Sequence, residues 1–395
     1  MKTIDNKELK EIIQSGHINL LVGSGCSLDY LTTLNDIENR MNEEATKEQA
    51  QKDYYKLIKK SKAVLDESLE SSADEKEKLT KTKQNYDSFL GFWANTISSR
   101  SLHIVNKQVN IFTTNFDMFM EDSCERLGIP YNDGFAGQIN PAFSVANFNK
   151  IQRYKSLQFD NISDIPLFNI IKLHGSISWQ VKDKKTKYEK IVYSNGTHIP
   201  NNLDEKTGKD FDNEYEEIAV INPNAEKHFE TVLDTNYASM LRKFTLELEK
   251  ENSILILVGF SLADKHIKNL LDGVMQSNPT LVVVYFSYSQ YDETKDKFEE
   301  KKRHNLYVIS SEITKEKFVN FFQNDDWKQF VKDDASAILE LVDDTKEKKD
   351  ASSEEVKKKL ERSISQTFED STEYLSKVFS KDGVSKQNED EKEQL

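Results

Sequence analysis

Four short apolar segments constrain the fold more than any other feature of this sequence, because each ends abruptly in small or hydrogen-bonding residues. They begin at Gly16, Val109, Phe168 and Ile254, and each is shorter than a typical helix. Such runs are typical of buried strands, and parallel strands bring their carboxyl ends to one edge of a sheet. Helical patterns separate the runs, so the sequence predicts an α/β fold with a parallel sheet covered by helices.

The first two segments run into residues that suit binding. The first is followed by Gly23-Ser24-Gly25-Cys26-Ser27. In such a loop backbone N–H groups can approach a phosphate closely, and the helix expected next offers its positive end. Only the first two glycines of GxGxxG are present, so an ordinary strand-to-helix turn explains the loop as well. The second segment is followed by Thr113-Thr114-Asn115-Phe116-Asp117, where helix capping needs one polar side chain and four are present.

The third segment ends in His174-Gly175-Ser176, and the fourth in Gly259-Phe260-Ser261. A lone histidine is more often a buried residue hydrogen-bonded to the backbone, but the three other polar strand ends favour a base at His174. Neutral imidazole can take a proton from a ribose hydroxyl or from water, and Asn115 could hold that water in line. The other six histidines lack such a setting, and His266 is expected inside the helix after Gly259.

Charge and composition exclude several classes of protein. The 68 acidic and 54 basic residues give a net charge of −14, which argues against nucleic-acid binding. The two cysteines, Cys26 and Cys124, can form neither a four-cysteine zinc site nor a disulfide framework, so a cytoplasmic location is expected. No apolar run reaches the roughly 18 residues of a membrane span. Protease, zincin and P-loop motifs are missing, and no metal is expected.

Composition also suggests how the chain is divided. We expect one domain over residues 1–310, with a helical insertion at about 35–104 and an exposed polar excursion at about 181–214. Residues 218–221 are expected to rejoin the main sheet. Residues 311–382 predict a helical C-terminal extension, and 383–395 a disordered tail. An aromatic stripe in the insertion is expected to pack it onto the sheet, with a substrate-lining role as the alternative: Tyr86, Phe89, Phe92 and Trp93.

In their order and spacing, the four motifs together resemble the sirtuin-like NAD-binding domain over roughly residues 15–290. The form is similar to the bacterial branch found in antiphage defence rather than to the protein deacylases, whose four-cysteine zinc module is absent and whose glutamine is replaced by Thr114. The resemblance implies a Rossmann-like fold with NAD+ as substrate. It implies that Asn115 and His174 are catalytic. It implies cofactor contacts from Gly23, Ser24, Gly25, Ser27, Thr114, Asp117, Gly259, Phe260 and Ser261.

The resemblance further implies an NAD+ glycohydrolase that forms nicotinamide and ADP-ribose and depletes cellular NAD+ in abortive infection. The expected partners are copies of the chain itself in a homo-oligomer and a HerA-type ring ATPase encoded nearby, with no membrane and no direct sequence-specific nucleic-acid contact. Two alternatives stay open. One is a non-catalytic scaffold that senses NAD+ or ADP-ribose, and the other is a sirtuin-type protein deacylase or ADP-ribosyltransferase.

Overall fold

The computed structural model describes residues 12–100, 105–157, 162–182, 190–193, 199–200, 202–215, 218–220, 235–262, 264–286 and 306–309. The chain divides into two compact units, Met1–Gln323 and Asn324–Leu395, and all described residues lie in the first. The predicted helical extension at 311–382 and the tail at 383–395 lie outside the described residues, so the predicted domain limits stay predictions.

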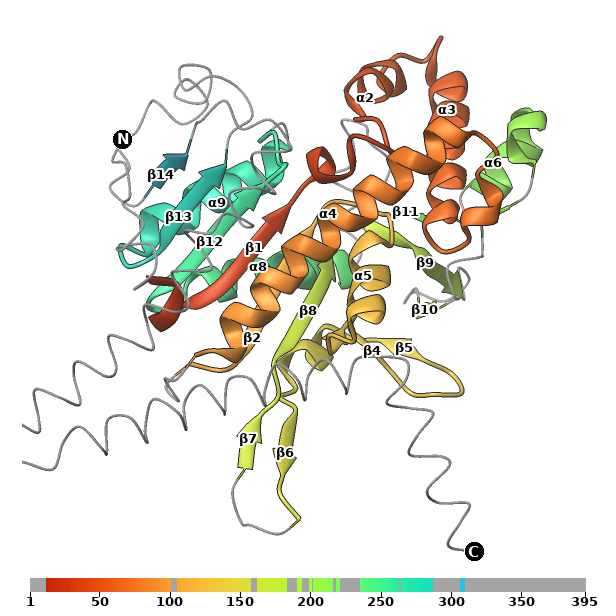
Figure 1. The fold of residues 1–395 in the computed structure, drawn as a ribbon. Helices are drawn as coiled ribbons and strands as arrows, with labels where there is room; N and C mark the ends of the chain where they lie inside the picture. The colour runs from red at the N-terminus through yellow and green to blue at the C-terminus, as the bar shows by residue number, and fades with distance from the viewer. Residues whose placement is uncertain are drawn as a thin grey trace, which may run out of the picture. The chain divides into compact units, whose positions relative to one another are not determined.

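A parallel sheet forms the centre of the first unit, with strand order β14-β13-β12-β1-β2-β8-β3 (Figure 1). The strands are β1 (His17–Val22), β2 (Gln108–Thr113), β3 (Tyr131–Asn132), β8 (Leu167–Lys172), β12 (Ser253–Val258), β13 (Val282–Phe286) and β14 (Leu306–Ile309). The four apolar runs are thus β1, β2, β8 and β12. The predicted α/β class and Rossmann-like parallel sheet are confirmed.

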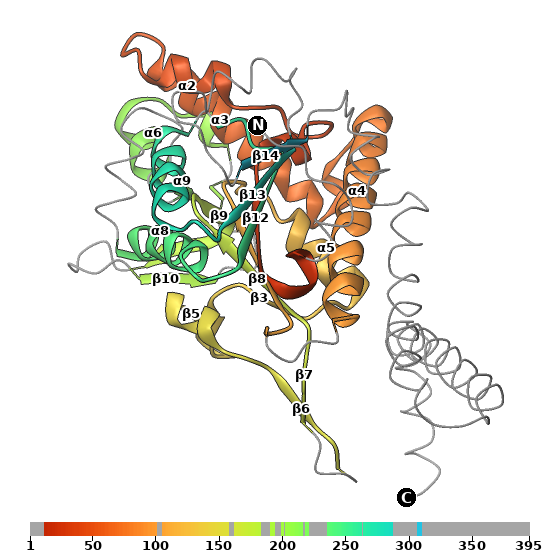
Figure 2. The same cartoon turned by 90° about the vertical axis from the view of Figure 1, so that its left-hand side faces the viewer.

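Helices cover both faces of this sheet, as Figure 2 shows edge-on. Helices α8 (Thr235–Leu248) and α9 (Lys265–Ser277) lie on one face, and α4 (Ala73–Ser98) and α5 (Phe119–Leu127) on the other. Helix α5 ends at Gly128, which takes the left-handed conformation (φ 65°) that closes a helix without a Cβ penalty. Among the described residues, no helix combines the length and apolar character needed to cross a membrane.

The segment predicted as a helical insertion forms α2 (Asn35–Met41), α3 (Lys47–Ser61) and α4, joined by two short 3-10 helices, Lys62–Val64 and Glu67–Leu69. Ser72 begins α4 because its hydroxyl accepts the backbone N–H of Glu75. In the aromatic stripe Tyr86, Phe89 and Trp93 are buried, as expected of a face that packs inward. Residues 101–104 lie outside the described part.

A second sheet contradicts the prediction for residues 218–221. It is antiparallel, in the order β11-β9-β10-β5-β4, and consists of β4 (Phe135–Ala136), β5 (Ala142–Phe143), β9 (Gly175–Lys182), β10 (Lys190–Tyr193) and β11 (Ile218–Val220). The prediction that residues 218–221 rejoin the main sheet is wrong, since β11 pairs with β9. Strand β9 starts a new sheet directly after the His174 turn, and later segments pair with it.

The polar segment 181–214 is also more structured than predicted. Strands β9 and β10 form an antiparallel pair, and a 3-10 helix (Leu203–Glu205) and α6 (Gly208–Tyr215) follow. Leu203 and Phe211 are fully buried, so this segment contributes to the core. The described residues of the segment are therefore not a simple exposed excursion. A third, two-stranded sheet of β6 (Arg153–Lys155) and β7 (Ile162–Asp164) extends away from the main sheet (Figure 1).

A row of buried asparagines crosses the main sheet. Asn19, Asn110 and Asn169 are register partners on β1, β2 and β8. Asn110 Nδ2 donates to Asn19 Oδ1 at 2.9 Å, and Asn169 Nδ2 donates to Asn110 Oδ1 at 2.8 Å. Glu247 of α8 accepts from Asn110 Nδ2 at 3.1 Å. We call this row the asparagine ladder, and it fixes the register of the three strands because a slip would leave buried amides unpaired.

Candidate functional site

The four predicted motifs follow four strands that are neighbours in the sheet. The order β12-β1-β2-β8 places them side by side. The last residues of these strands form one row of register partners, Val258, Val22, Thr113 and Lys172. The first and fourth motifs begin immediately after this row, the third begins one residue later, and the second begins within the row at Thr113. The strand order and register therefore confirm the prediction that the four motifs meet at one edge of the sheet.

The glycines of the first and fourth motifs pack against each other. A Cβ on Gly23 or Gly25 would lie 2.5 Å or 2.8 Å from the carbonyl oxygen of Gly259. A Cβ on Gly259 would lie 2.7 Å from the backbone nitrogen of Cys26, and Gly259 has a φ of +61°. All three positions thus require glycine for the approach of two backbones, whether or not a ligand is bound.

The same contact occupies donors that were expected to face a phosphate. Gly23 N–H donates to the Val258 carbonyl and Gly25 N–H to the Gly259 carbonyl, each at 2.9 Å. The helix expected after the loop is only a four-residue 3-10 helix, Ser24–Ser27, and the next α-helix begins at Asn35. The expectation of a helix directly after the loop, with its positive end toward the loop, is therefore wrong.

A directed chain of hydrogen bonds joins the first and second motifs. Asn115 Nδ2 donates to the Gly23 carbonyl at 3.1 Å and to Tyr86 Oη at 3.4 Å. Ser27 Oγ lies 2.8 Å from Tyr86 Oη and donates to Asp117 Oδ2 at 3.0 Å, so the Tyr86 hydroxyl must donate to Ser27. We call Asn115, Tyr86, Ser27 and Asp117 the buried relay, since each is at most 5% exposed.

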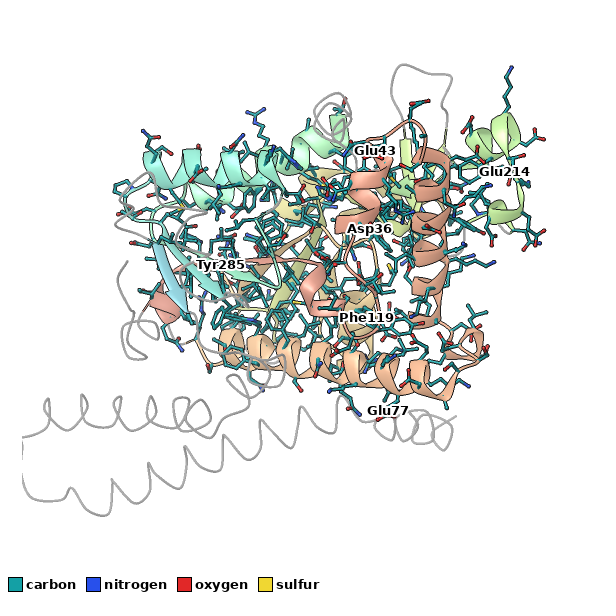
Figure 3. The ribbon with its side chains drawn as sticks, turned by 90° about the horizontal axis from the view of Figure 1, so that it is seen from above. Asp36, Glu43, Glu77, Phe119, Glu214 and Tyr285 are labelled. Atoms are coloured by element: carbon teal, nitrogen blue, oxygen red, sulfur yellow. The ribbon has the colours of Figure 1, made fainter. Side chains whose placement is uncertain are left out.

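Tyr86 is a member of this relay that the sequence assigned to the core stripe, with a substrate-lining role as the alternative. Its ring stacks on Phe119, with centroids 5.1 Å apart and planes 3° from parallel. Figure 3 shows Phe119 on the side of the sheet that α4 covers. The helical insertion therefore supplies both packing and a hydroxyl to the site, and the i, i+3, i+7 pattern alone reports only the packing.

Burial controls the titration of the groups in and beside the relay. It raises the pKa of Asp117, against the opposing effects of the Lys172 cation and the Ser27 hydroxyl. Burial also raises the pKa of the Cys26 thiol to about 12, with the Asp117 carboxyl adding to the effect. Cys26 is therefore a neutral thiol at neutral pH and is not a nucleophile. Lys172 pairs with the Glu121 carboxylate at 3.1 Å, and both side chains are buried.

Asn115 keeps one atom out of these contacts. Its Oδ1 is buried and has no hydrogen-bond partner among the residues that the structure describes. A buried orphan acceptor costs roughly 1–3 kcal/mol unless a ligand or water satisfies it. This oxygen is therefore the atom of Asn115 that can accept a hydrogen bond from a bound hydroxyl or water.

The third and fourth motifs meet at a pair of histidines. His174 lies in the turn between β8 and β9, and its Nε2 is 3.4 Å from Nε2 of His266 in the first turn of α9. Asp264 precedes α9, and its Oδ1 lies 3.6 Å from His266 Nδ1. His266 was predicted inside the helix, which is correct, but its position beside His174 was not predicted. The helix begins at the sheet edge, so its first turn lies beside His174.

Backbone contacts hold the His174 turn against the second motif. Leu173 N–H donates to the Thr113 carbonyl at 2.8 Å, and Ile177 N–H donates to the Phe116 carbonyl at 3.0 Å. The turn that carries His174 is thus fixed on both sides to the loop that carries Asn115. The structure therefore brings the two predicted catalytic residues onto adjoining loops.

The remaining predicted contacts differ in exposure. Ser24 and Ser261 are exposed, Thr114 and Gly259 are partly buried, and Phe260 is buried. The Phe260 carbonyl accepts a hydrogen bond from Tyr285 Oη at 3.0 Å, which anchors the fourth motif to β13, where Figure 3 labels Tyr285. Ser24, Thr114 and Ser261 therefore retain exposed surface for a ligand, while Ser27 and Asp117 are engaged within the protein.

A family model described as "SIR2-like domain" matches residues 109–309, more than half of the chain. The chain belongs to the SIR2-like domain family. The SIR2-like match begins in β2 and contains the motifs of Asn115, His174 and Gly259. The Gly23 loop lies before the matched residues, yet it packs against Gly259 within them.

One solved structure is similar to this SIR2-like chain. Its title is "Crystal structure of a Sir2 homolog-NAD complex", and it is 12% identical with a TM-score of 0.40. The alignment covers 81% of this chain and 93% of that chain. Comparison with curated proteins gives no match.

Proposed function

We propose that this SIR2-like protein is an NAD+ glycohydrolase that cleaves NAD+ to nicotinamide and ADP-ribose. The observation that carries the proposal is the row of strand ends, which sets the loops of Gly23, Asn115, His174 and Gly259 side by side. Membership of the SIR2-like domain family supports NAD+ as the ligand. A ligand beyond the carboxyl ends of parallel strands is the general arrangement in open α/β sheets.

The reaction needs a water molecule and a place for one proton. The bond between nicotinamide N1 and ribose C1′ breaks, nicotinamide leaves with the bonding electrons, and the water oxygen bonds to C1′. In the proposal His174 takes the proton that this water loses, because neutral imidazole is a base near neutral pH. The orphan Asn115 Oδ1 accepts a hydrogen bond from the same water or from a ribose hydroxyl and so holds it in line.

The test is to incubate the purified full chain with NAD+ and to quantify nicotinamide and ADP-ribose by chromatography. Asn115→Ala and His174→Ala should each lower the rate by roughly 100-fold or more, the usual contribution of a positioned proton acceptor. Matched controls are His17→Ala at the opposite end of β1 and Asn95→Ala on the exposed side of α4, and both should keep wild-type rates. Wild-type protein that forms neither product, alone or with its genomic neighbour, would contradict the proposal.

The buried relay favours a second candidate, a scaffold that binds NAD+ or ADP-ribose without cleaving it. Ser27, Asp117 and Asn115 were expected to contact the cofactor or substrate. In the structure Ser27 is hydrogen-bonded to Asp117 and Tyr86, and Asn115 is hydrogen-bonded to Gly23. A sensor needs such rigid coupling between loops and no catalytic turnover. Tight binding without products, with the alanine variants keeping their biological effect, would identify this function. Nicotinamide release that requires an added protein substrate would instead indicate deacylation or ADP-ribosylation.

The proposal includes a role in antiphage defence, in which NAD+ depletion ends the infection of a cell. It rests on the resemblance of the four motifs to the defence branch. The proposed partners are further copies of the chain and a HerA-type ring ATPase. Cells that express the chain with that neighbour should lose NAD+ after phage infection, and His174→Ala should prevent the loss. Unchanged NAD+ in infected cells that survive the phage would contradict this role.

A further inference from the structure

The two histidines at the sheet edge face each other with the same nitrogen. The Nε2 atoms of His174 and His266 are 3.4 Å apart, and the rings are tilted by 32° with centroids 5.5 Å apart. Two such nitrogens can share one proton, or both lone pairs can point to one cation. In a tetrahedral zinc site with bonds of about 2.0–2.1 Å, two nitrogen ligands lie about 3.3–3.4 Å apart. The observed separation matches that edge.

A carboxylate completes the group. One ligand atom from each of His174, His266 and Asp264 lies within 4.8 Å of the other two. The Asp264 side chain makes no capping hydrogen bond to α9, although Asp264 is the N-cap residue, and its Oδ1 lies 3.6 Å from His266 Nδ1. This nitrogen is not the one that faces His174, so the Asp264 carboxylate must turn toward Nε2 of His266 to share a cation with both histidines. Two histidines and one carboxylate are a common ligand set for divalent transition metals.

The surroundings also suit a cation. His266 and Asp264 have only 4% and 13% of their side chains exposed, while His174 is partly exposed. A site with two shielded ligands and one at the surface binds a metal in a low-dielectric environment and keeps a coordination position open to solvent. His174 comes from the turn after β8, and Asp264 and His266 come from the start of α9, with one ligand atom of each within 4.8 Å of the others.

We propose that His174, His266 and Asp264 form a binding site for a divalent transition cation such as Zn²⁺. Occupancy of this site takes the Nε2 lone pair of His174. A metal-bound His174 cannot accept a proton at that atom, so the cation inhibits any reaction that uses it as a base. The capacity to bind metal does not depend on the proposed NAD+ cleavage; only the inhibition rests on it.

The test is a titration of the full chain, freed of metal with a chelator, with Zn²⁺ in competition with a chromogenic chelator. Wild-type protein should bind one equivalent, and His266→Ala should weaken the binding by roughly 100-fold. Asp264→Asn should weaken it by about 10- to 100-fold. His17→Ala is the matched control and should bind like the wild type, since His17 lies at the other end of β1.

Absence of binding by the wild type, or equal affinity in His266→Ala, would overturn the proposal. If His266→Ala does not fold, His266→Gln and the visible spectrum of the Co²⁺-loaded wild type replace it. A spectrum typical of fully hydrated Co²⁺ would then overturn the site. Inhibition is measured separately, as loss of NAD+ cleavage on adding Zn²⁺ and recovery on adding chelator. A chain that binds Zn²⁺ at this site but never cleaves NAD+ contradicts the proposed function and leaves the metal site standing.

Discussion

Replacing Gly259 by alanine tests whether the close approach of the first and fourth motifs holds the site together. The added Cβ would lie 2.7 Å from both the backbone nitrogen and Sγ of Cys26, and 3.1 Å from the carbonyl carbon of Gly25. Two of these atoms are backbone, so they cannot swing away as a side chain can. The backbone at Gly259 also has a φ of +61°, which disfavours any residue with a Cβ.

The expected cost follows from these two effects. A left-handed alanine costs about 1–2 kcal/mol, and an added methyl in a filled space costs about 1–3 kcal/mol. Alanine also restricts the unfolded chain, which returns about 0.4–1 kcal/mol. Gly259→Ala should therefore lower the free energy of unfolding by roughly 2–4 kcal/mol, and it should weaken the proposed NAD+ cleavage because the Gly23 loop must move.

The same substitution at Gly273 is the control. Gly273 lies within α9, and a Cβ there would meet nothing within 4 Å. Alanine inside a helix is more favourable than glycine by roughly 0.5–1 kcal/mol, so Gly273→Ala should raise the free energy of unfolding. Urea denaturation followed by tryptophan fluorescence compares the two variants. Gly259→Ala with wild-type or greater stability would refute the reasoning, because the contact would then yield at no cost.

Three further predictions concern buried polar groups. Asn110→Ala removes three hydrogen bonds of the asparagine ladder and should lower the free energy of unfolding by about 2–4 kcal/mol, as judged by urea denaturation; a smaller effect would mean that the ladder contributes little. Cys26 should react with a thiol reagent far more slowly in the native protein than in urea at pH 8, because its pKa is raised to about 12; rapid native labelling would contradict the raised pKa. Burial raises the pKa of Asp117, so the folded state favours its protonated form. The stability that this protonation adds is present below the usual carboxyl pKa, and it is lost as the pH rises through the raised pKa. Asp117→Asn should therefore remove this pH dependence from the free energy of unfolding. An unchanged dependence on pH would contradict the raised pKa of Asp117.

The strands of the main sheet could be predicted because burial on both faces leaves a readable signal. β12 begins at Ser253 and β1 at His17, each within one residue of the predicted run. The rule that parallel strands share an edge then placed the four motifs together without further information. The asparagine ladder could not be predicted, since an asparagine within an apolar run gives no indication of its partner on the next strand.

The second sheet could not be predicted for a related reason. Ile218–Val220 has the composition of a buried strand, and composition does not say which strand it pairs with. Its partner, β9, begins at Gly175, immediately after the His174 turn, where a new chain direction starts. Glycine at 175 has a φ of +84°, which permits that change of direction. The turn that presents His174 therefore also starts the second sheet.

His266 shows why membership of a helix does not exclude membership of a site. The sequence places it in α9, and periodicity assigns a buried helical residue to the core. In a parallel sheet, however, each helix that follows a strand begins near the carboxyl edge, so the first turn of α9 lies where the motifs meet. A polar residue in the first turn of such a helix is therefore a candidate for the site, whereas the same residue two turns later belongs to the core. Applied to α5, this reasoning selects Glu121, the third helical residue, which pairs with Lys172 in the terminal row of β8.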